Sequence, residues 1–371
     1  MMQNVNIPHG WKATKLGKQC TMFSGGTPYV DAPEYYGGTI PFIRSAEINS
    51  DKTELFLTDA GMTNSSAKLV NNGDLLYALY GATSGEVGLA KISGAINQAI
   101  LCIRSETVNI KFLYYVLQNR KNRILSKYLQ GGQGNLSAQI IKTLPIALPP
   151  LPEQEKIAGI LGTWDRAIEE LTELITEKKE LRKGLANRLL NGLMWQDVEL
   201  SDLLNYEQPT KYLVTEILDY DAQKTPVLTA NKAFILGSTD DTTGVYSKQD
   251  CIIFDDFTTD MKYVDFSFKV KSSAIKILTP RENVNLKFVF EQMLRLKLPM
   301  GGHKRHWVSE YQYLTVKMPD ENLQNKIVFI LSKADSEINL LNQWLAVLKE
   351  QKRGLMQKLL TGEIRVKVDD K

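Results

Sequence analysis

Two short segments of the sequence combine glycine with side chains that can contact phosphates and base edges. Residues 131–135 read Gly-Gly-Gln-Gly-Asn, and residues 301–307 read Gly-Gly-His-Lys-Arg-His-Trp. Each segment lies in a longer run that contains no aspartate or glutamate, at residues 107–152 and 292–309. A basic run taken singly is typical of a solvated face. Because it occurs at corresponding places in both halves of the chain, it favours a nucleic-acid partner.

The same segments offer little for metal binding or catalysis. His303 and His306 have the spacing of a metal pair, but no carboxylate or cysteine accompanies them, and Lys304 and Arg305 would repel a cation. We therefore expect no metal site. The glycine-rich phosphate loops and the nucleophile and zinc-protease motifs of common enzymes are missing from the sequence. We expect no catalytic residue on this chain.

The composition is that of a globular protein with a buried core. The chain has 371 residues, enough for two or three domains, and is 43% hydrophobic and 23% charged, which excludes disorder. Its three cysteines lie far apart, so we expect neither a disulfide framework nor a zinc module. No apolar stretch approaches the roughly 20 residues of a membrane span. We expect a cytoplasmic location without a membrane partner.

An internal repeat with an interval of 170 residues organises the chain. Residues 149–192 align without a gap on residues 319–362, with 16 identities in 44 positions. Ahead of these segments, Trp11 and Leu16 have the same spacing as Trp195 and Leu200. The halves otherwise differ strongly in length and content. The repeat therefore predicts a variable domain followed by a shared segment, twice over.

Both shared segments predict long helices with one apolar stripe. The first stripe consists of Ile157, Leu161, Trp164, Ile168, Leu171 and Ile175, and the second of Ile327, Leu331, Ala334, Ile338, Leu341 and Leu345. Both alternate steps of four and three residues, the spacing of a coiled-coil seam. In the alternative interpretation, each helix packs only on its own domain. A stripe kept at every step of both copies favours a shared partner surface.

Connectivity predicts the arrangement of these elements. The first variable domain leads into the start of the first helix, and the second begins directly after its end, so a second helix that packs on the first must run antiparallel. The predicted fold class is α+β, with two mixed α/β domains separated by two long antiparallel helices that form a coiled coil with pseudo-twofold symmetry. The predicted boundaries are 1–148 and 193–318 for the domains, and 149–192 and 319–365 for the helices.

Within the domains, alternating apolar runs predict strands and longer amphipathic runs predict helices. The expected strands cover residues 39–43, 74–80, 99–103, 251–254 and 274–278. The expected helices cover residues 111–129 and 286–296.

Several motifs together resemble the specificity (S) subunit of type I restriction-modification systems. They are the opening Pro8-His9-Gly10-Trp11-Lys12, the junction Leu-Pro-Pro-Leu-Pro-Glu-Gln-Glu-Lys-Ile at 148–157, and the tails Leu-Leu-Asn-Gly at 189–192 and Leu-Leu-Thr-Gly at 359–362. The Asp-Asp-Phe-Thr-Thr-Asp stretch at 255–260 resembles one found in target recognition domains of that family. One position departs from the pattern, because Leu323 stands where the second repeat usually has glutamate. This departure concerns the start of the second helix.

The resemblance implies a DNA-recognition subunit that bears no catalytic residue. Two target recognition domains would each read one half of a bipartite site in double-stranded DNA, while the helices would set the spacer and dock two modification subunits. The resemblance assigns S-adenosylmethionine and adenine N6 methylation to those subunits, and ATP- and Mg²⁺-dependent cleavage to added restriction subunits, leaving this chain without a cofactor. Intrinsic methyl transfer would instead favour an enzyme of another class. A lack of salt-dependent DNA binding would favour a purely structural bridging protein.

Polar and aromatic side chains in the divergent parts are the candidate base readers. In the first domain these are Arg44, Ser45, Tyr80, Ser84, Gln98, Gln133 and Asn135. In the second domain they are Thr229, Asn231, Lys232, Thr258, Thr259, Lys304, Arg305 and Trp307. The alternative for each of them is a solvated loop position.

Overall fold

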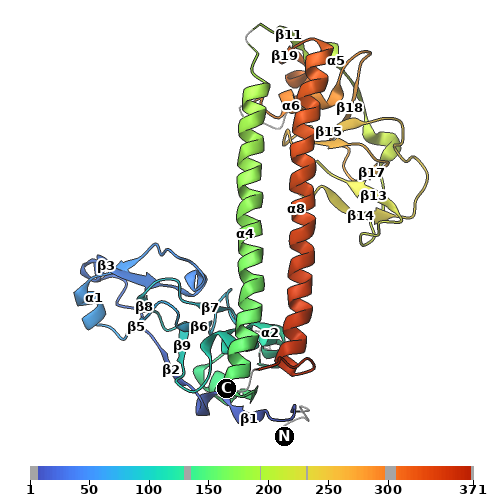
Figure 1. The fold of residues 1–371 in the computed structure, drawn as a ribbon. Helices are drawn as coiled ribbons and strands as arrows, with labels where there is room; N and C mark the ends of the chain where they lie inside the picture. The colour runs from blue at the N-terminus through green and yellow to red at the C-terminus, as the bar shows by residue number, and fades with distance from the viewer. Residues whose placement is uncertain (1–6, 129–134, 193, 231–232, 297–305, 369–371) are drawn as a thin grey trace. The chain divides into compact units, whose positions relative to one another are not determined.

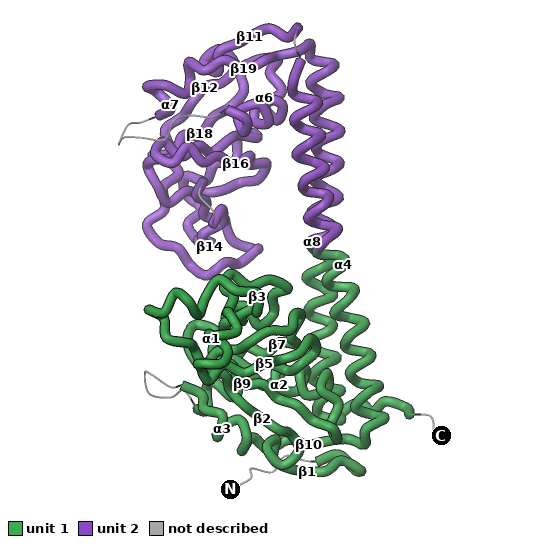
Figure 2. Tube along the Cα trace, turned by 90° about the vertical axis from the view of Figure 1, so that its left-hand side faces the viewer, with its two compact units in different colours: residues 1–172, 343–371 green, residues 173–342 purple. Residues whose placement is uncertain are grey.

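The computed structural model describes residues 7–128, 135–192, 194–230, 233–296 and 306–368 (Figure 1). The chain divides into two compact units, shown in different colours in Figure 2. Unit 1 comprises residues 1–172 and 343–371, and unit 2 comprises residues 173–342. The long helices α4 (Leu151–Leu189) and α8 (Glu321–Thr361) each contribute one part to both units. Each unit therefore combines one variable domain with parts of both long helices.

Unit 1 is built on two four-stranded sheets. The first is antiparallel, with the order β2 (Thr21–Ser24), β9 (Ile100–Arg104), β6 (Leu75–Ala78) and β7 (Val87–Leu89). The second has the order β4 (Phe56–Leu57), β3 (Tyr36–Ile43), β8 (Gly94–Ile96) and β5 (Lys68–Val70). Short helices α1 (Asp59–Thr63) and α3 (Ala138–Thr143) and the longer α2 (Ile110–Tyr128) complete the unit.

Side-chain alternation along β6 explains how these layers pack. Leu75 and Tyr77 point into the cluster that holds Phe112 of α2, whereas Leu76 and Ala78 join the cluster of the second sheet. Successive residues of a strand face opposite sides of a sheet, so β6 is buried on both faces. The central sheet of unit 1 therefore lies between a helix and the second sheet.

Unit 2 repeats this plan. Its four-stranded antiparallel sheet has the order β12 (Leu204–Glu207), β18 (Ile275–Pro280), β15 (Cys251–Asp255) and β16 (Met261–Val264). A second sheet consists of β14 (Ile235–Thr239), β13 (Thr225–Leu228) and β17 (Lys269–Val270), and the helices of the domain are α5 (Leu200–Leu203), α6 (Leu286–Met293) and α7 (His306–Ser309). Phe254 faces the cluster of α6, and Ile253 faces the other side. The repeat therefore extends from the helices to the sheets.

A two-stranded ladder precedes each long helix. In unit 1, β1 (Lys12–Lys15) pairs antiparallel with β10 (Pro145–Leu148), and in unit 2, β11 (Gln196–Glu199) pairs antiparallel with β19 (Thr315–Met318). Leu16 and Leu200, which directly follow β1 and β11, have no exposed surface. The predicted correspondence of Trp11 and Leu16 with Trp195 and Leu200 is confirmed, because each pair brackets the first strand of its ladder.

The apolar stripes of α4 and α8 meet in antiparallel fashion within each unit. In unit 1, Ile157 and Leu161 of α4 share a core cluster with Met356 and Leu359 of α8. In unit 2, Ala186 and Leu190 from the end of α4 pack with Ile327 and Leu331 from the start of α8. The predicted antiparallel seam is confirmed. The same clusters contain Phe112 of α2 and Phe288 of α6, so the stripes also pack on their own domains.

The start of α8 is unaffected by Leu323. Helices α4 and α8 begin at equivalent positions of the repeat, and in both the glutamine side chain of the fourth helical residue donates a hydrogen bond to a proline carbonyl. Gln154 Nε2 lies 2.8 Å from the Pro149 oxygen, and Gln324 Nε2 lies 2.8 Å from the Pro319 oxygen. This shared bond, rather than the residue before the glutamine, fixes the chain at both helix starts.

Candidate nucleic-acid interface

The hairpin between β6 and β7 gathers several of the predicted base readers of unit 1. Tyr80 and Ser84 lie on this hairpin, and the Tyr80 hydroxyl is hydrogen-bonded to the side chain of Gln98. Gln98 Oε1 in turn accepts a hydrogen bond from Thr27 Oγ1 at 2.6 Å. Ser84 Oγ donates to the Leu79 carbonyl at 3.1 Å, which ties the hairpin to itself. The structure therefore brings Tyr80, Ser84 and Gln98 close together.

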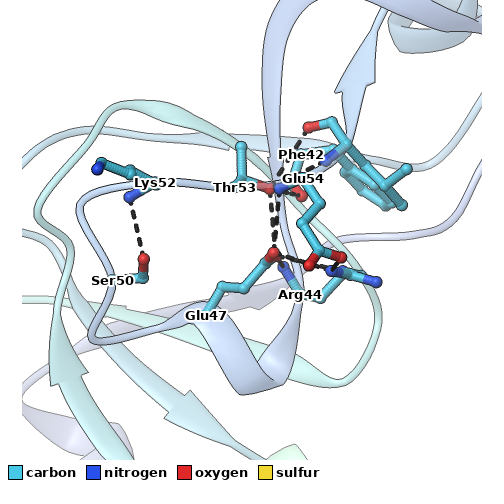
Figure 3. Close-up of polar contacts among 8 residues, drawn as sticks. Phe42, Arg44, Glu47, Ser50, Lys52, Thr53 and Glu54 are labelled. Atoms are coloured by element: carbon cyan, nitrogen blue, oxygen red, sulfur yellow. Dashed lines mark hydrogen bonds and ion pairs between the residues drawn. The ribbon is translucent and has the colours of Figure 1, made fainter. Parts of the chain in front are cut away.

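Arg44 is held by two carboxylates (Figure 3). Its guanidinium donates to Glu47 Oε1 at 2.9 Å and to Glu54 Oε2 at 2.6 Å, and its backbone amide donates to Glu47 Oε2 at 3.0 Å. Burial alone would raise the pKa of Glu47, but the hydrogen bonds that its carboxylate accepts from Arg44, the Glu54 amide and the Thr53 hydroxyl outweigh burial and lower that pKa to about 2. The two carboxylates offset the positive charge of Arg44 and occupy its Nε and Nη2 groups, which weakens its attraction for a phosphate. Ser45, the next residue, is half-buried.

The corresponding hairpin of unit 2, between β15 and β16, carries Thr258 and Thr259. Thr258 is exposed, and Thr259 adopts a left-handed backbone conformation with φ of 58°. This conformation is uncommon for a β-branched residue and marks a tight turn. The sheet therefore presents this short turn at the end of its central strand. Thr229 directly follows β13 in the second sheet and is 8% exposed.

Trp307 occupies a different environment from the one predicted. Its side chain is 1% exposed and packs in the core cluster beside Phe254 and Tyr311, with ring centroids at 5.5 and 6.1 Å. A ring enclosed in this way cannot reach a base edge, so the prediction of Trp307 as a base reader does not fit its position. Asn135 is exposed. The predicted readers Gln133, Asn231, Lys232, Lys304 and Arg305 lie outside the described residues.

The basic residues of the acid-free runs have two different roles. Arg120 Nη1 donates to the Pro145 carbonyl at 2.7 Å, and Arg295 Nη1 donates to the Leu190 carbonyl at 2.7 Å. These arginines satisfy backbone groups, and Arg295 does so at the end of α4, where helix carbonyls lack helical partners. Four other basic residues of the first run have exposed side chains, namely Lys111, Arg123, Lys127 and Lys142.

The described part of the chain holds no group of three or more histidine, cysteine, aspartate or glutamate side chains placed to bind a metal ion. His306 is 4% exposed, with Nδ1 at 3.4 Å from Glu310 Oε2. Burial raises the pKa of Cys20 to about 11 and that of Cys102 and Cys251 to about 12. Such thiols stay protonated and are poor nucleophiles near neutral pH.

The sequence did not identify Phe257 as a surface residue. Its side chain is 55% exposed at the β15–β16 turn, between Asp256 and Thr258. Phe257 lies two residues beyond the end of β15, and Tyr80 lies two residues beyond the end of β6, so the signal in the sequence is an aromatic residue closely following a central strand in both halves.

Two units whose central sheets have the same strand order, linked by two unbroken helices, define an internally duplicated protein of mixed α and β structure. Residues 8–181 match the family model described as the type I restriction modification DNA specificity domain. This part of the chain is therefore similar to the DNA specificity domain of type I restriction-modification systems.

Known proteins resemble the chain over different lengths. The EcoR124I/EcoR124II type I restriction enzyme specificity subunit of Escherichia coli is 39% identical over 196 residues, which cover 48% of this chain and 48% of that protein. The chain thus spans about half the length of that relative. The putative MjaX specificity subunit of Methanocaldococcus jannaschii is 21% identical over 97% of this chain and 95% of that protein.

The fold is also similar to that of a solved structure. The crystal structure of the S subunit of a type I restriction-modification system from M. genitalium matches 97% of this chain and 98% of its own, with a TM-score of 0.65 and 18% identity. At this identity the likeness concerns the fold alone. Among the described residues, no helix is both long and apolar enough to cross a membrane.

Proposed function

We propose that this chain is the DNA sequence-recognition subunit of a type I restriction-modification complex. Unit 1 reads one half of a bipartite site in double-stranded DNA, and unit 2 reads the other half. The observation that carries the proposal is the duplication of one scaffold with two different sets of loops. Both central sheets have the same strand order, while the loops that leave them differ in length and sequence. Equal scaffolds with unequal loops suit two different half-sites.

In this proposal, the helices α4 and α8 provide the docking surfaces for the modification subunits. Their stripes are preserved in both copies, and each copy also keeps an apolar residue at an exposed position outside the stripe. Leu174 of α4 is 38% exposed, and Trp344 at the equivalent position of α8 is 58% exposed. Two equivalent apolar positions fit two copies of one partner, the modification subunit.

In this proposal, the partner subunits catalyse the reactions. The modification subunits bind S-adenosylmethionine and methylate adenine, and restriction subunits cleave DNA with ATP and Mg²⁺. The chain itself supplies positioning, which is consistent with the missing enzyme motifs and the high pKa of its thiols. Exposed lysine and arginine side chains of α2 and its surroundings supply the salt-dependent part of DNA binding.

A domain exchange tests the proposal. Residues 11–147 are replaced by the corresponding domain of another specificity subunit, and the chain is produced with its modification subunits in cells that lack the native system. Adenine methylation is then mapped by sequencing. We expect a bipartite motif in which only one half-site changes. A change in both halves would contradict independent reading, and methyl transfer by the purified chain alone would contradict the non-catalytic role.

A further inference from the structure

In each unit, one backbone hydrogen bond fastens the central hairpin to the chain that follows the glycine-rich segment. In unit 1, the Leu136 amide donates to the Leu79 carbonyl at 3.0 Å. In unit 2, the His306 amide donates to the Asp256 carbonyl at 3.1 Å. Leu79 directly follows β6 and Asp256 directly follows β15, while Leu136 and His306 occupy the same position of the 170-residue repeat. The two bonds are therefore equivalent.

The next residue of each hairpin is aromatic. Tyr80 follows Leu79, and Phe257 follows Asp256, although the two hairpins share little else in sequence. The Phe257 side chain is 55% exposed, and Tyr80 is half-buried with its hydroxyl on Gln98. An aromatic ring thus stands at the same place of both scaffolds, directly beside the fastening bond.

Buried carboxylates hold the backbone of Phe257 in position. Asp255, 6% exposed, accepts hydrogen bonds at Oδ1 from the Phe257 amide at 2.9 Å and the Thr258 amide at 3.0 Å. Asp256 is 1% exposed and accepts from the Trp307 amide at 2.8 Å, while its other oxygen lies 3.2 Å from Lys276 Nζ. The turn is therefore preorganised, and a partner that contacts the ring does not have to order it first.

The chemistry of a phenyl ring limits what it can recognise on DNA. It has no hydrogen-bond donor or acceptor, so it cannot read the polar edge of a base. In the major groove, the apolar group that such a side chain contacts is the C5-methyl of thymine. The neighbouring Thr258 adds a methyl group and a hydroxyl to the same exposed turn.

We propose that Phe257 is a specificity-determining residue of the half-site read by unit 2, and that its ring packs on the C5-methyl group of a thymine. Tyr80 takes the equivalent place at the half-site read by unit 1. This inference rests on the proposed function, and adds to it one residue and the base feature that this residue recognises.

The test uses the full chain assembled with its modification subunits. The methylation motif of the wild-type complex is mapped first, and synthetic duplexes are made that carry the motif with 2′-deoxyuridine in place of one thymine at a time. Uracil differs from thymine only by the missing methyl group. Dissociation constants are measured for wild type, Phe257→Ala and Phe257→Leu. The matched control is Tyr313→Ala, because Tyr313 is 58% exposed but lies outside the hairpin.

We expect the wild-type complex to bind about fourfold more weakly when one particular thymine of the second half-site becomes uracil, the effect of losing one buried methyl group. Phe257→Ala should bind the thymine duplex more weakly by a similar factor and show no further loss with uracil there. Phe257→Leu should keep part of the difference in affinity between the thymine and uracil duplexes, and Tyr313→Ala should keep all of that difference. Thermal unfolding of Phe257→Ala should match wild type, since the ring is exposed.

Two failures can be told apart. A wild-type complex that methylates no defined motif would contradict the proposed function itself. A wild-type complex with a defined motif, combined with a Phe257→Ala variant that keeps the wild-type response to every uracil, would contradict this inference alone. If the thymine whose methyl effect disappears in Phe257→Ala lies in the half-site read by unit 1, the assignment of Phe257 to the half-site read by unit 2 is also contradicted.

Discussion

Asp165 of α4 forms an ion pair with Lys352 of α8, 187 positions further along the chain. Asp335 of α8 pairs with Arg182 of α4 in the same way, with Nε to Oδ1 at 2.9 Å, and both residues are equivalent to the first pair in the repeat. The duplication therefore reproduces an interaction with the donor and acceptor helices exchanged. Each unit contains one of these pairs, so the polar positions of the helix seam follow the same pseudo-symmetry as the apolar ones.

A third residue contacts each of these two ion pairs, and its type differs between the units. This difference gives the first prediction. Tyr115 Oη donates to Asp165 at 2.6 Å, whereas the equivalent Glu291 is an acceptor for Arg182 and its side chain is 6% exposed. Arg182→Met leaves a buried carboxylate without its partner, at a cost of about 3–5 kcal/mol in the free energy of unfolding. Lys352→Met is the matched variant and should cost about 1 kcal/mol, because only a half-exposed Asp165 loses its partner.

Urea unfolding of both variants measures this difference. A second substitution, Glu291→Gln, should recover most of the stability lost in Arg182→Met, since it removes the uncompensated charge. Equal losses in the free energy of unfolding for Arg182→Met and Lys352→Met would show that the buried carboxylate of Glu291 adds nothing to the cost of removing Arg182.

The second prediction concerns acid. The folded protein holds the pKa of Glu47 at about 2, below the ordinary 4.5, so the ionised carboxylate stabilises the fold fully above pH about 4.5. This contribution declines as the pH falls from about 4.5 to about 2. Glu47→Gln should reduce stability at neutral pH and make unfolding less dependent on pH in that window. Glu54→Gln is the control, because the Glu54 side chain is 81% exposed. Parallel pH profiles for wild type and Glu47→Gln would contradict the assignment.

The third prediction tests the partner surfaces of the helices. Trp344→Ala and Leu174→Ala should each weaken co-purification of a tagged modification subunit, and the double variant should weaken it most. Leu181→Ala is a suitable control, because Leu181 is 65% exposed but the equivalent residue of α8 is Gln351. A loss of binding in Leu181→Ala as large as in the other two would point away from a duplicated docking surface.

The fourth prediction concerns the spacer between half-sites. Insertion of four residues after Ile175 lengthens α4 by about 6 Å and shifts its seam, because a four-residue insertion is a stutter. We expect the methylation motif to keep both half-sites and to gain about one or two base pairs between them. A matching insertion after Leu345, the equivalent position of α8, should restore the register of the seam. An active variant with an unchanged spacer would show that the helices do not set it.

Much of the fold follows from sequence periodicity. The stripe from Ile157 to Ile175 predicted α4, the strand expected at 74–80 contains β6, and the strand expected at 251–254 lies in β15. These predictions succeed because an apolar stripe or alternation directly reflects which face is buried. The helix expected over 286–296 ends earlier, at Met293, and the short strands of the second sheets lack a strong pattern.

The interface was harder to predict, because the roles of its residues depend on partners far away in the sequence. Trp307 closely follows Lys304 and Arg305 in the sequence, yet its ring fills the core next to Phe254, 53 positions earlier. Arg295 lies in an acid-free run, yet it bonds to the Leu190 carbonyl, 105 positions away. No local pattern distinguishes an arginine that binds a backbone carbonyl from one that faces a phosphate.

The position held by Leu323 has a consequence for how such chains can exchange parts. In unit 1, Glu153 pairs with Arg365, with Nε to Oε1 at 2.7 Å, whereas in unit 2 the equivalent residue Leu323 packs on an apolar cluster that also receives Trp195. A chimaera that combines the helix start of the first half with the domain of the second would place a glutamate on the apolar cluster of unit 2, and the reverse combination would leave Arg365 facing a leucine. Recombination between related genes therefore preserves the fold best when its crossover points transfer each of these residues together with its partner.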